Sequence, residues 1–122
     1  MDINRHKFHG NYKLSGYEPK KIIVNNTEYK HSIVVSNNTL VTNWEPQQAK
    51  QITSNDIESL ITLDPEIIII GTGNKHHFID EAILEVAFNQ NIPVEMMSSS
   101  KACMLYTILI QEQKHVVAAI MP

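Results

Sequence analysis

The feature that most constrains the fold is an unbroken run of four isoleucines at residues 67–70, followed by Gly71-Thr72-Gly73. Isoleucine is branched at Cβ and favours extended backbone. A strand with no polar alternation has no side that can face water, so it must be covered on both faces, as parallel strands between two layers of helices are. The run therefore predicts an inner strand of a sheet, which the two glycines end.

Two further apolar strands follow this run, each after a segment with helical character. Residues 92–97 and 116–121 are the predicted strands, and the serines at 98–100 can cap the helix between them. The segment before residue 92 has apolar residues at steps of three and four, as in an amphipathic helix: Ile79, Ala82, Ile83, Val86 and Ala87. Strand, helix, strand, helix, strand predicts parallel strands with right-handed crossovers. We therefore expect a compact three-layer Rossmann-like α/β domain with a mostly parallel central sheet.

Antiparallel strands are predicted before this unit. Residues 33–35 and 39–42 flank Asn37-Asn38, a pattern typical of a hairpin. We expect this hairpin to add an antiparallel layer to the domain. An alternative role for the chain is a structural homo-oligomer, in which the hairpin at residues 33–41 pairs edge to edge with a second copy. Asn55 and Glu58 have the spacing of a capping box, which predicts a short helix after the hairpin.

The first thirty residues are mostly polar, and six of the chain's basic residues lie at or before Lys30. Residues 22–24 are a candidate short strand before the Asn25-Asn26 turn signal. We otherwise expect a solvated N-terminal arm over residues 1–30, at most partly ordered, and a single domain over residues 31–122.

Composition narrows the possible functions. The chain of 122 residues has ten Lys and Arg against thirteen Asp and Glu, and its basic residues are not interleaved with aromatics, so nucleic-acid binding is not expected. The longest apolar runs are far shorter than the ~20 residues of a membrane-spanning helix. A single cysteine cannot form an internal disulfide, which favours a reducing compartment. We expect a soluble, cytoplasmic protein without membrane insertion.

A candidate ligand site lies at the end of the isoleucine strand. Backbone N–H groups of Gly71-Thr72-Gly73, placed before a helix, could hold an anion. Glu95 would reach the same crevice from the second strand, and Ser99 and Tyr106 would add polar contacts. The alternative is that the glycines only permit a tight turn and close packing. Neither a dinucleotide fingerprint nor a phosphate-binding Walker motif is present, so no cofactor is predicted.

Metal and nucleophile chemistry have weaker signals. His76 and His77 precede Asp80 and Glu81, but their spacing matches no metal motif, and the acidic pair suits the first turn of a helix. Cys103 near a helix N-terminus could be a nucleophile, or a small core residue, as most free cysteines are. We predict no metal site and assign no catalytic residue.

Residues 31–122 resemble the MTH-type domain family, which bacterial and archaeal proteins of unknown function share with an adipogenesis-associated protein and a mitochondrial complex I assembly factor. The resemblance is carried by five segments in order: Ser32-Ile33-Val34-Val35 with Trp44, Pro65 with residues 67–73, residues 92–97, Ala102-Cys103 with Tyr106, and residues 116–120. It implies a compact α/β fold with an added antiparallel layer. This chain departs from it at Ser98-Ser99, where family members often have Asp-Thr, and around Tyr106, where polar residues are replaced by Met104 and Leu105.

Two functions are consistent with these features. The resemblance favours a non-catalytic accessory protein, similar to an assembly factor, that binds another protein. The alternative is a small ligand-binding module or enzyme that uses the crevice at Gly71-Thr72-Gly73.

Overall fold

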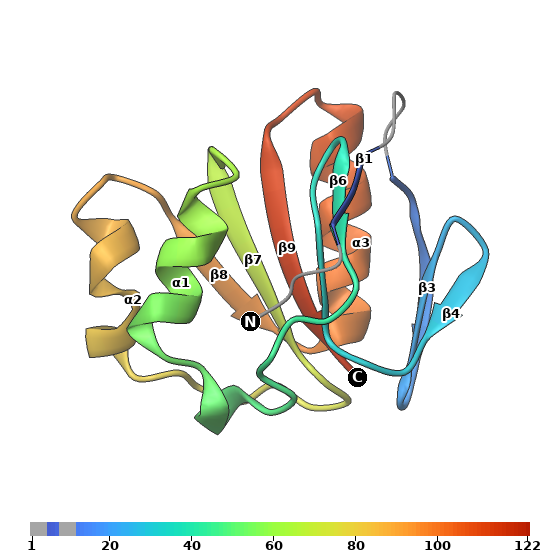
Figure 1. Cartoon of the computed structure of the whole chain (residues 1–122), viewed down its shortest axis with the longest axis horizontal. Helices are drawn as coiled ribbons and strands as arrows, with labels where there is room; N and C mark the ends of the chain where they lie inside the picture. The colour runs from blue at the N-terminus through green and yellow to red at the C-terminus, as the bar shows by residue number, and fades with distance from the viewer. Residues whose placement is uncertain (1–4, 8–11) are drawn as a thin grey trace.

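The computed structural model describes residues 5–7 and 12–122 (Figure 1). In these residues the chain forms two sheets and three α-helices. The strands are β1 (Arg5–Lys7), β2 (Leu14–Glu18), β3 (Lys21–Val24), β4 (Thr27–Tyr29), β5 (Ile33–Val35), β6 (Thr39–Val41), β7 (Ile67–Thr72), β8 (Val94–Met97) and β9 (Val116–Met121). The helices are α1 (Ser54–Ile61), α2 (Glu81–Phe88) and α3 (Ser99–Gln111), with a 3-10 turn, η1, at Ala49–Gln51.

The isoleucine run lies inside the larger sheet, whose strand order is β1-β6-β5-β9-β7-β8. Strands β8 and β9 both run parallel to β7, and Ile68 is opposite Val94 on one side and Val117 on the other. Ile68, Ile69 and Ile70 are completely buried. The predicted inner strand, with parallel neighbours from residues 92–97 and 116–121, is confirmed.

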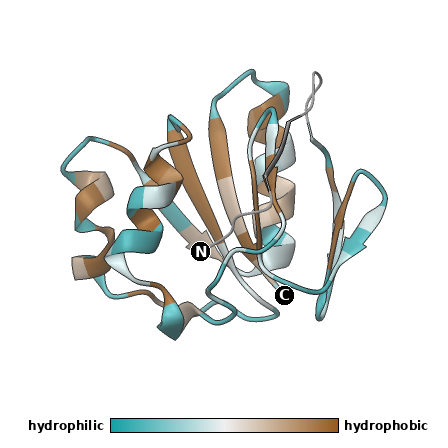
Figure 2. Ribbon diagram, viewed as in Figure 1, coloured by the Kyte–Doolittle hydropathy of each residue, from teal (hydrophilic) through white to brown (hydrophobic). Residues whose placement is uncertain are grey.

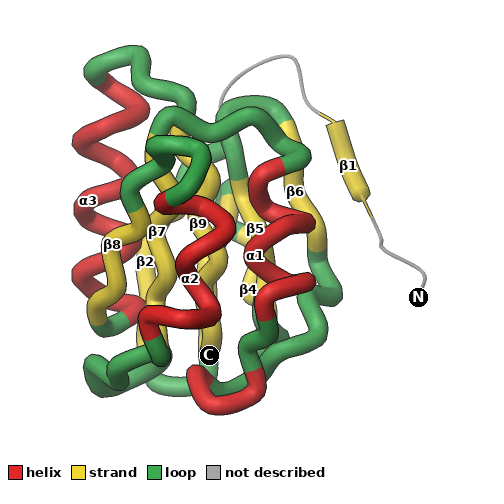
Figure 3. Tube along the Cα trace, turned by 90° about the vertical axis from the view of Figure 1, so that its left-hand side faces the viewer, coloured by secondary structure: helices red, strands yellow, loops and turns green. Residues whose placement is uncertain are grey.

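Helices cover both faces of this sheet because successive β7 side chains point to opposite sides. Ile68 and Ile70 belong to a core cluster with α1 and α2, whereas Ile69 belongs to a second cluster with α3. Figure 1 shows α1 and α2 on one side of the sheet and α3 on the other, and Figure 3 looks onto α1 and α2. The strongly hydrophobic colouring of β7 and β9 in Figure 2 agrees with burial on both faces.

The prediction of a mostly parallel sheet is wrong, because the hairpin β5–β6 joins it. Strand β5 pairs antiparallel with β9, β6 pairs antiparallel with β5, and β1 pairs antiparallel with β6. Only the two pairings of β7 are parallel in this sheet, which is therefore mixed. The hairpin pairs with the edge of β9 that β7 leaves free, and its apolar side chains are buried there, so it extends the sheet and forms no separate layer.

The added antiparallel layer is made instead by β2, β3 and β4, which pack against α3 on its far side (Figure 1). Ile22 and Val24 are fully buried there. Asn25 and Asn26 have φ of 48° and 68°, the left-handed values that a tight hairpin turn between β3 and β4 requires. The predicted strand and turn are confirmed, and residues 14–29 form a sheet packed on α3 where a polar arm, at most partly ordered, was expected.

Both edges of the hairpin β5–β6 are bonded in the described part of the chain. Its β5 edge is bonded to β9, and its β6 edge is bonded to β1 over residues 39–41. An edge-to-edge contact between this hairpin and a second copy would therefore have to displace β1.

The helix starts agree with the predicted segments, with one shift. Ser98 caps α3 and Asp80 caps α2. Helix α1 is capped by Thr53 and Asp56, whose side chains each accept from the other residue's backbone N–H in a capping box. The predicted pair, Asn55 and Glu58, is therefore wrong by two residues. The helix begins before Asn55, so Asn55 lies inside its first turn.

Gly71 allows α3 to come into direct contact with β7. A Cβ at this position would lie 2.9 Å from Ser99 Cα and 3.0 Å from Ala102 Cβ. The first of these atoms belongs to the backbone and cannot rotate away. Gly71 is therefore a packing glycine, which is the alternative considered for the turn.

We expect the substitution Gly71→Ala to lower the free energy of unfolding by about 1–3 kcal/mol, the usual cost of overpacking a core. Gly16→Ala is the matched control, since a Cβ at Gly16 would meet only Ile23 Cδ1 at 4.0 Å. Alanine lowers the conformational entropy of the unfolded chain, so the stability of this control should stay the same or rise by up to about 1 kcal/mol. Urea unfolding of both variants measures the difference, and equal stabilities would disprove the close-packing role.

Candidate functional site

Ser99 joins the ends of two strands to the beginning of α3. Its hydroxyl donates to the carbonyl of Met121 at 2.6 Å and accepts from the N–H of Gly73 at 2.8 Å. The Ser99 N–H donates to the Gly73 carbonyl at 2.8 Å. Because Ser99 is completely buried, these bonds are shielded from water and hold the segments in one arrangement.

Thr72 shapes the loop that follows β7. Its hydroxyl lies 2.7 Å from the Lys75 carbonyl and 3.1 Å from the Met97 carbonyl, and it accepts from the His77 N–H at 3.0 Å. The loop thus turns back on the strand end. Gly73, with φ of 93°, supplies the left-handed residue at which the turn begins.

The turn at Gly73 does not lead directly into a helix N-terminus, which the predicted anion site at Gly71-Thr72-Gly73 requires. Helix α2 begins only at Glu81, so the loop of residues 73–80 separates the turn from the helix N-terminus. The N-terminus that does approach Gly73 is that of α3, and Ser99 occupies the space between them. Asp80 accepts from the Ala82 N–H at 3.1 Å, which confirms that the acidic residues belong to a helix start.

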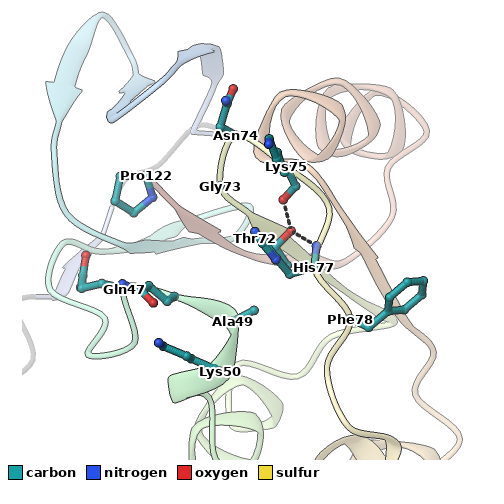
Figure 4. A pocket seen from close by; sticks show the side chains of 11 residues that line it. Gln47, Ala49, Lys50, Thr72, Gly73, Asn74, Lys75, His77, Phe78 and Pro122 are labelled. Atoms are coloured by element: carbon teal, nitrogen blue, oxygen red, sulfur yellow. Dashed lines mark hydrogen bonds between the residues drawn. The ribbon is translucent and has the colours of Figure 1, made fainter.

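The loop and residues 47–50 enclose a cavity of about 600 Å³ (Figure 4). Thr72, Gly73 and the loop residues after them form one wall. The other wall comes from the segment that leads into η1, and Pro122 also lines the cavity. In Figure 4 the two walls face each other, with Pro122 at the side.

Only two of the six predicted site residues line this cavity, namely Thr72 and Gly73. Gly71 and Ser99 come close to them but are packed in the core. Glu95 is exposed on β8, which is an edge strand.

Tyr106 belongs to the core cluster between α3 and the smaller sheet. Its hydroxyl lies 3.1 Å from the Ser36 carbonyl and 3.3 Å from the Tyr12 carbonyl, and burial raises its pKa. These bonds give Tyr106 a structural role in joining α3 to the segments before β2 and after β5.

Sequence reasoning missed the other side chains around the cavity, apart from His77, which it considered only as a metal ligand. Lys50 and Lys75 are exposed cations on opposite walls, and His77 and Asn74 flank Lys75. They lie in polar loops that match no motif and are far apart in the chain. Their only signal was the position of Asn74, Lys75 and His77 directly after a strand-ending glycine.

Cys103 is a core residue, and its surroundings exclude a reactive thiolate at neutral pH. Its side chain is 5% exposed, and burial raises the pKa of the thiol to about 12. A thiol of this kind is protonated and a poor nucleophile. The interpretation as a small core residue is confirmed.

The described part of the chain also bears on metal binding and on membranes. No group of three or more His, Cys, Asp or Glu residues within it could hold a metal ion. No helix within it is both long enough and apolar enough to cross a membrane.

The fold defines a small α/β protein in which one helix, α3, lies between a mixed six-stranded sheet and a three-stranded antiparallel sheet. The chain belongs to the family described as protein of unknown function (DUF498/DUF598), whose model matches residues 14–121. This match begins within the segment that was expected to be a solvated arm.

Curated relatives are of two kinds. A protein of Francisella tularensis subsp. holarctica called 13 kDa major membrane protein is 26% identical over 118 residues, which cover 95% of each chain. The NADH dehydrogenase (ubiquinone) 1 alpha subcomplex assembly factor 3 of Rattus norvegicus is 29% identical over 84 residues. That match covers 67% of this chain and 45% of the rat protein, so the chain spans less than half the length of this relative.

Solved structures share the whole fold. A crystal structure of a Bordetella parapertussis protein matches with a TM-score of 0.87 and 26% identity, over 93% of this chain and 97% of that one. A solution structure from Bordetella pertussis, described as a Mth938-like domain, matches with a TM-score of 0.79 and 21% identity, over 100% and 92%. The expected membership of the MTH-type family is confirmed.

We expect Ser99→Ala to lower the free energy of unfolding by about 1–3 kcal/mol, because it leaves the Gly73 N–H and the Met121 carbonyl buried without their partner. Ser100→Ala, at an exposed position on the same helix, is the control and should change it by less than about 0.5 kcal/mol. Thermal and urea unfolding compare the two variants. A neutral Ser99→Ala would show that Ser99 does not hold the strand ends.

The raised pKa of Cys103 also predicts a dependence of stability on pH. The unfolded thiol ionises near pH 9, whereas the folded thiol stays protonated to about pH 12, so its contribution is complete below pH 9 and is lost as pH rises towards 12. Cys103→Ala removes this contribution. Between pH 9 and 11 the variant should lose less stability than the native protein, by up to about 1.4 kcal/mol per pH unit. Parallel slopes in urea titrations would contradict the burial of the thiol.

Proposed function

We propose that this protein is a non-catalytic accessory protein that binds another protein through α3 and β2. The observation that carries the proposal is an exposed apolar pair on α3. Met104 and Ile108 have 65% and 52% of their surface exposed, and a spacing of four residues places them on one face of the helix. Large apolar side chains grouped in this way are typical of interaction surfaces.

A groove beside this pair supports the proposal. It has a volume of about 590 Å³ and runs between α3 and β2, with Met104 and Ile108 on one side and Leu14 and Tyr17 on the other. Cys103 also lines it. The groove suits an apolar side chain from an amphipathic segment of the partner, since helices and strands are recognised by such anchors.

The relatives support the same class of function. The rat protein and its homologues are called assembly factors of NADH dehydrogenase, and such a role requires contact with other proteins. This chain corresponds to under half of their length, so we extend to it only the capacity to bind a protein. We also propose a cytoplasmic location, which the single cysteine, buried as a free thiol, supports.

The test is affinity capture from native cells with the protein and with the double variant Met104→Glu, Ile108→Glu. Two charges in the apolar groove should reduce the captured partner at least tenfold, because binding would then bury an unpaired charge. Phe88→Glu is the control, since Phe88 is 41% exposed on α2, away from the groove, and should leave capture unchanged. Equal thermal stability of the variants shows that folding is intact.

Two results would contradict the proposal. One is a captured protein that binds the double variant as strongly as the native chain. The other is native protein from which no stoichiometric partner is recovered.

A second candidate function is small-molecule binding in the cavity beside Gly73. The specific observation in its favour is the volume of about 600 Å³ between two walls that come from distant parts of the chain. This volume lies within the range of about 300–1,000 Å³ that ligand pockets occupy.

A further inference from the structure

The side chains around the cavity beside Gly73 have an uneven charge. Its charged side chains are the two cations Lys50 and Lys75, and within the described residues no acidic side chain lines it. Neither ammonium group has an ion-pair partner among those residues. The chain as a whole is acidic, with a net charge of −3, so this local excess of positive charge is not a general property of its surface. A concave surface lined by charges of one sign concentrates ions of the opposite sign.

Hydrogen bonds hold both walls in place. On the first wall, the Gln47 amide nitrogen donates to the carbonyls of Trp44 at 3.0 Å and Glu45 at 3.2 Å, while its oxygen accepts from the Ser32 N–H at 3.1 Å. On the second wall, Thr72 bonds to the backbone of Lys75 and His77. Rigid walls lower the entropy lost on binding, so the lysine side chains are the parts left to adjust to a ligand.

An exposed aromatic side chain lies at the edge of the cavity. Phe78 lines it yet is 85% exposed, and its ring lies 4.8 Å from that of His76 between centroids. In Figure 4 the Phe78 ring projects away from the loop at the edge of the cavity. An exposed ring of this kind offers a face on which a planar heterocycle can stack.

From this arrangement we infer that the cavity binds a nucleoside phosphate, with the phosphates between Lys50 and Lys75 and the base against Phe78. The inference rests on the ligand-binding candidate above and adds the chemical class of the ligand. Lysines on opposite walls suit a ligand with more than one phosphate group, because each ammonium can then pair with its own phosphate.

The test uses the full chain labelled with ¹⁵N and titrated with adenosine diphosphate, inorganic pyrophosphate and adenosine. We expect the diphosphate to shift the amide signals of Lys50, Gly73 and Lys75 and to bind at least tenfold more tightly than adenosine. Its affinity should fall as ionic strength rises, because the contacts are between exposed charges.

Three variants test the assigned contacts. Lys50→Ala and Lys75→Ala should each weaken adenosine diphosphate binding at least fivefold, whereas Lys101→Ala, an exposed lysine on α3 outside the cavity, should change it less than twofold. Phe78→Ala should weaken binding of the diphosphate and leave pyrophosphate binding within twofold of the native value. The substituted side chains are exposed, so the melting temperatures should be unchanged.

The inference is overturned if adenosine diphosphate and pyrophosphate do not bind at millimolar concentration, if the shifted amides lie elsewhere, or if the Lys50 and Lys75 variants bind like the native protein. A panel of neutral and cationic small molecules, followed on the same amides, separates it from the broader candidate. Binding of one of these at the cavity would retain a ligand site and reject the phosphate class. A panel with no response would reject both.

Discussion

The contact between the N-terminus of α3 and the end of β7 is the interaction on which the arrangement of the molecule depends. Gly71 removes the side chain that would keep the helix away, and Ser99 fills the resulting space with a hydroxyl bonded to two strands. Both residues are buried, so their geometry is fixed by packing as well as by hydrogen bonds. The same contact determines where the loop after Gly73 leaves the sheet, and hence where the cavity opens.

This contact also places α3 between two sheets. One side of the helix packs on β7 and β9, and another packs on β2, so Ala102 and Tyr106 are buried. The remaining side carries Met104 and Ile108 at the border of the groove with β2. A single helix therefore contributes both to the core and to the surface that we propose for partner binding. The cavity lies at the end of the sheet, on other elements, so the two proposed functions involve separate surfaces.

The central part of the fold could be predicted because short stretches of its sequence indicate their own environment. Four successive isoleucines leave no polar face, so the strand must be buried on both sides. The pair Asn25-Asn26 favours a turn whatever follows it, and the structure gives both residues the left-handed φ values of a tight turn. The partner of a strand is not indicated by its local sequence. The residues of the hairpin at 33–41 are compatible with a separate layer and with an extension of the sheet. The hairpin extends the sheet because β9 has a free edge with which β5 pairs.

The candidate site was less predictable than the fold, for a related reason. Thr72 and Gly73 were identified from their position after a strand, but Lys50 reaches the same cavity from a segment more than twenty residues earlier. Ser99 and Tyr106 were expected to contact a ligand because they are polar, yet their hydroxyl groups bond to backbone carbonyls inside the core. A polar residue type indicates that a hydrogen-bond partner is needed, and it does not indicate whether that partner is solvent, ligand or the chain itself.

The place of Pro122 has a practical consequence for work on this protein. This residue lines the cavity, and its carbonyl oxygen would be 3.2 Å from a Cβ at Gly73. A label joined at this carbonyl would start at the cavity wall, beside Gly73, so binding measurements on the cavity are better made with a label at another point of the chain.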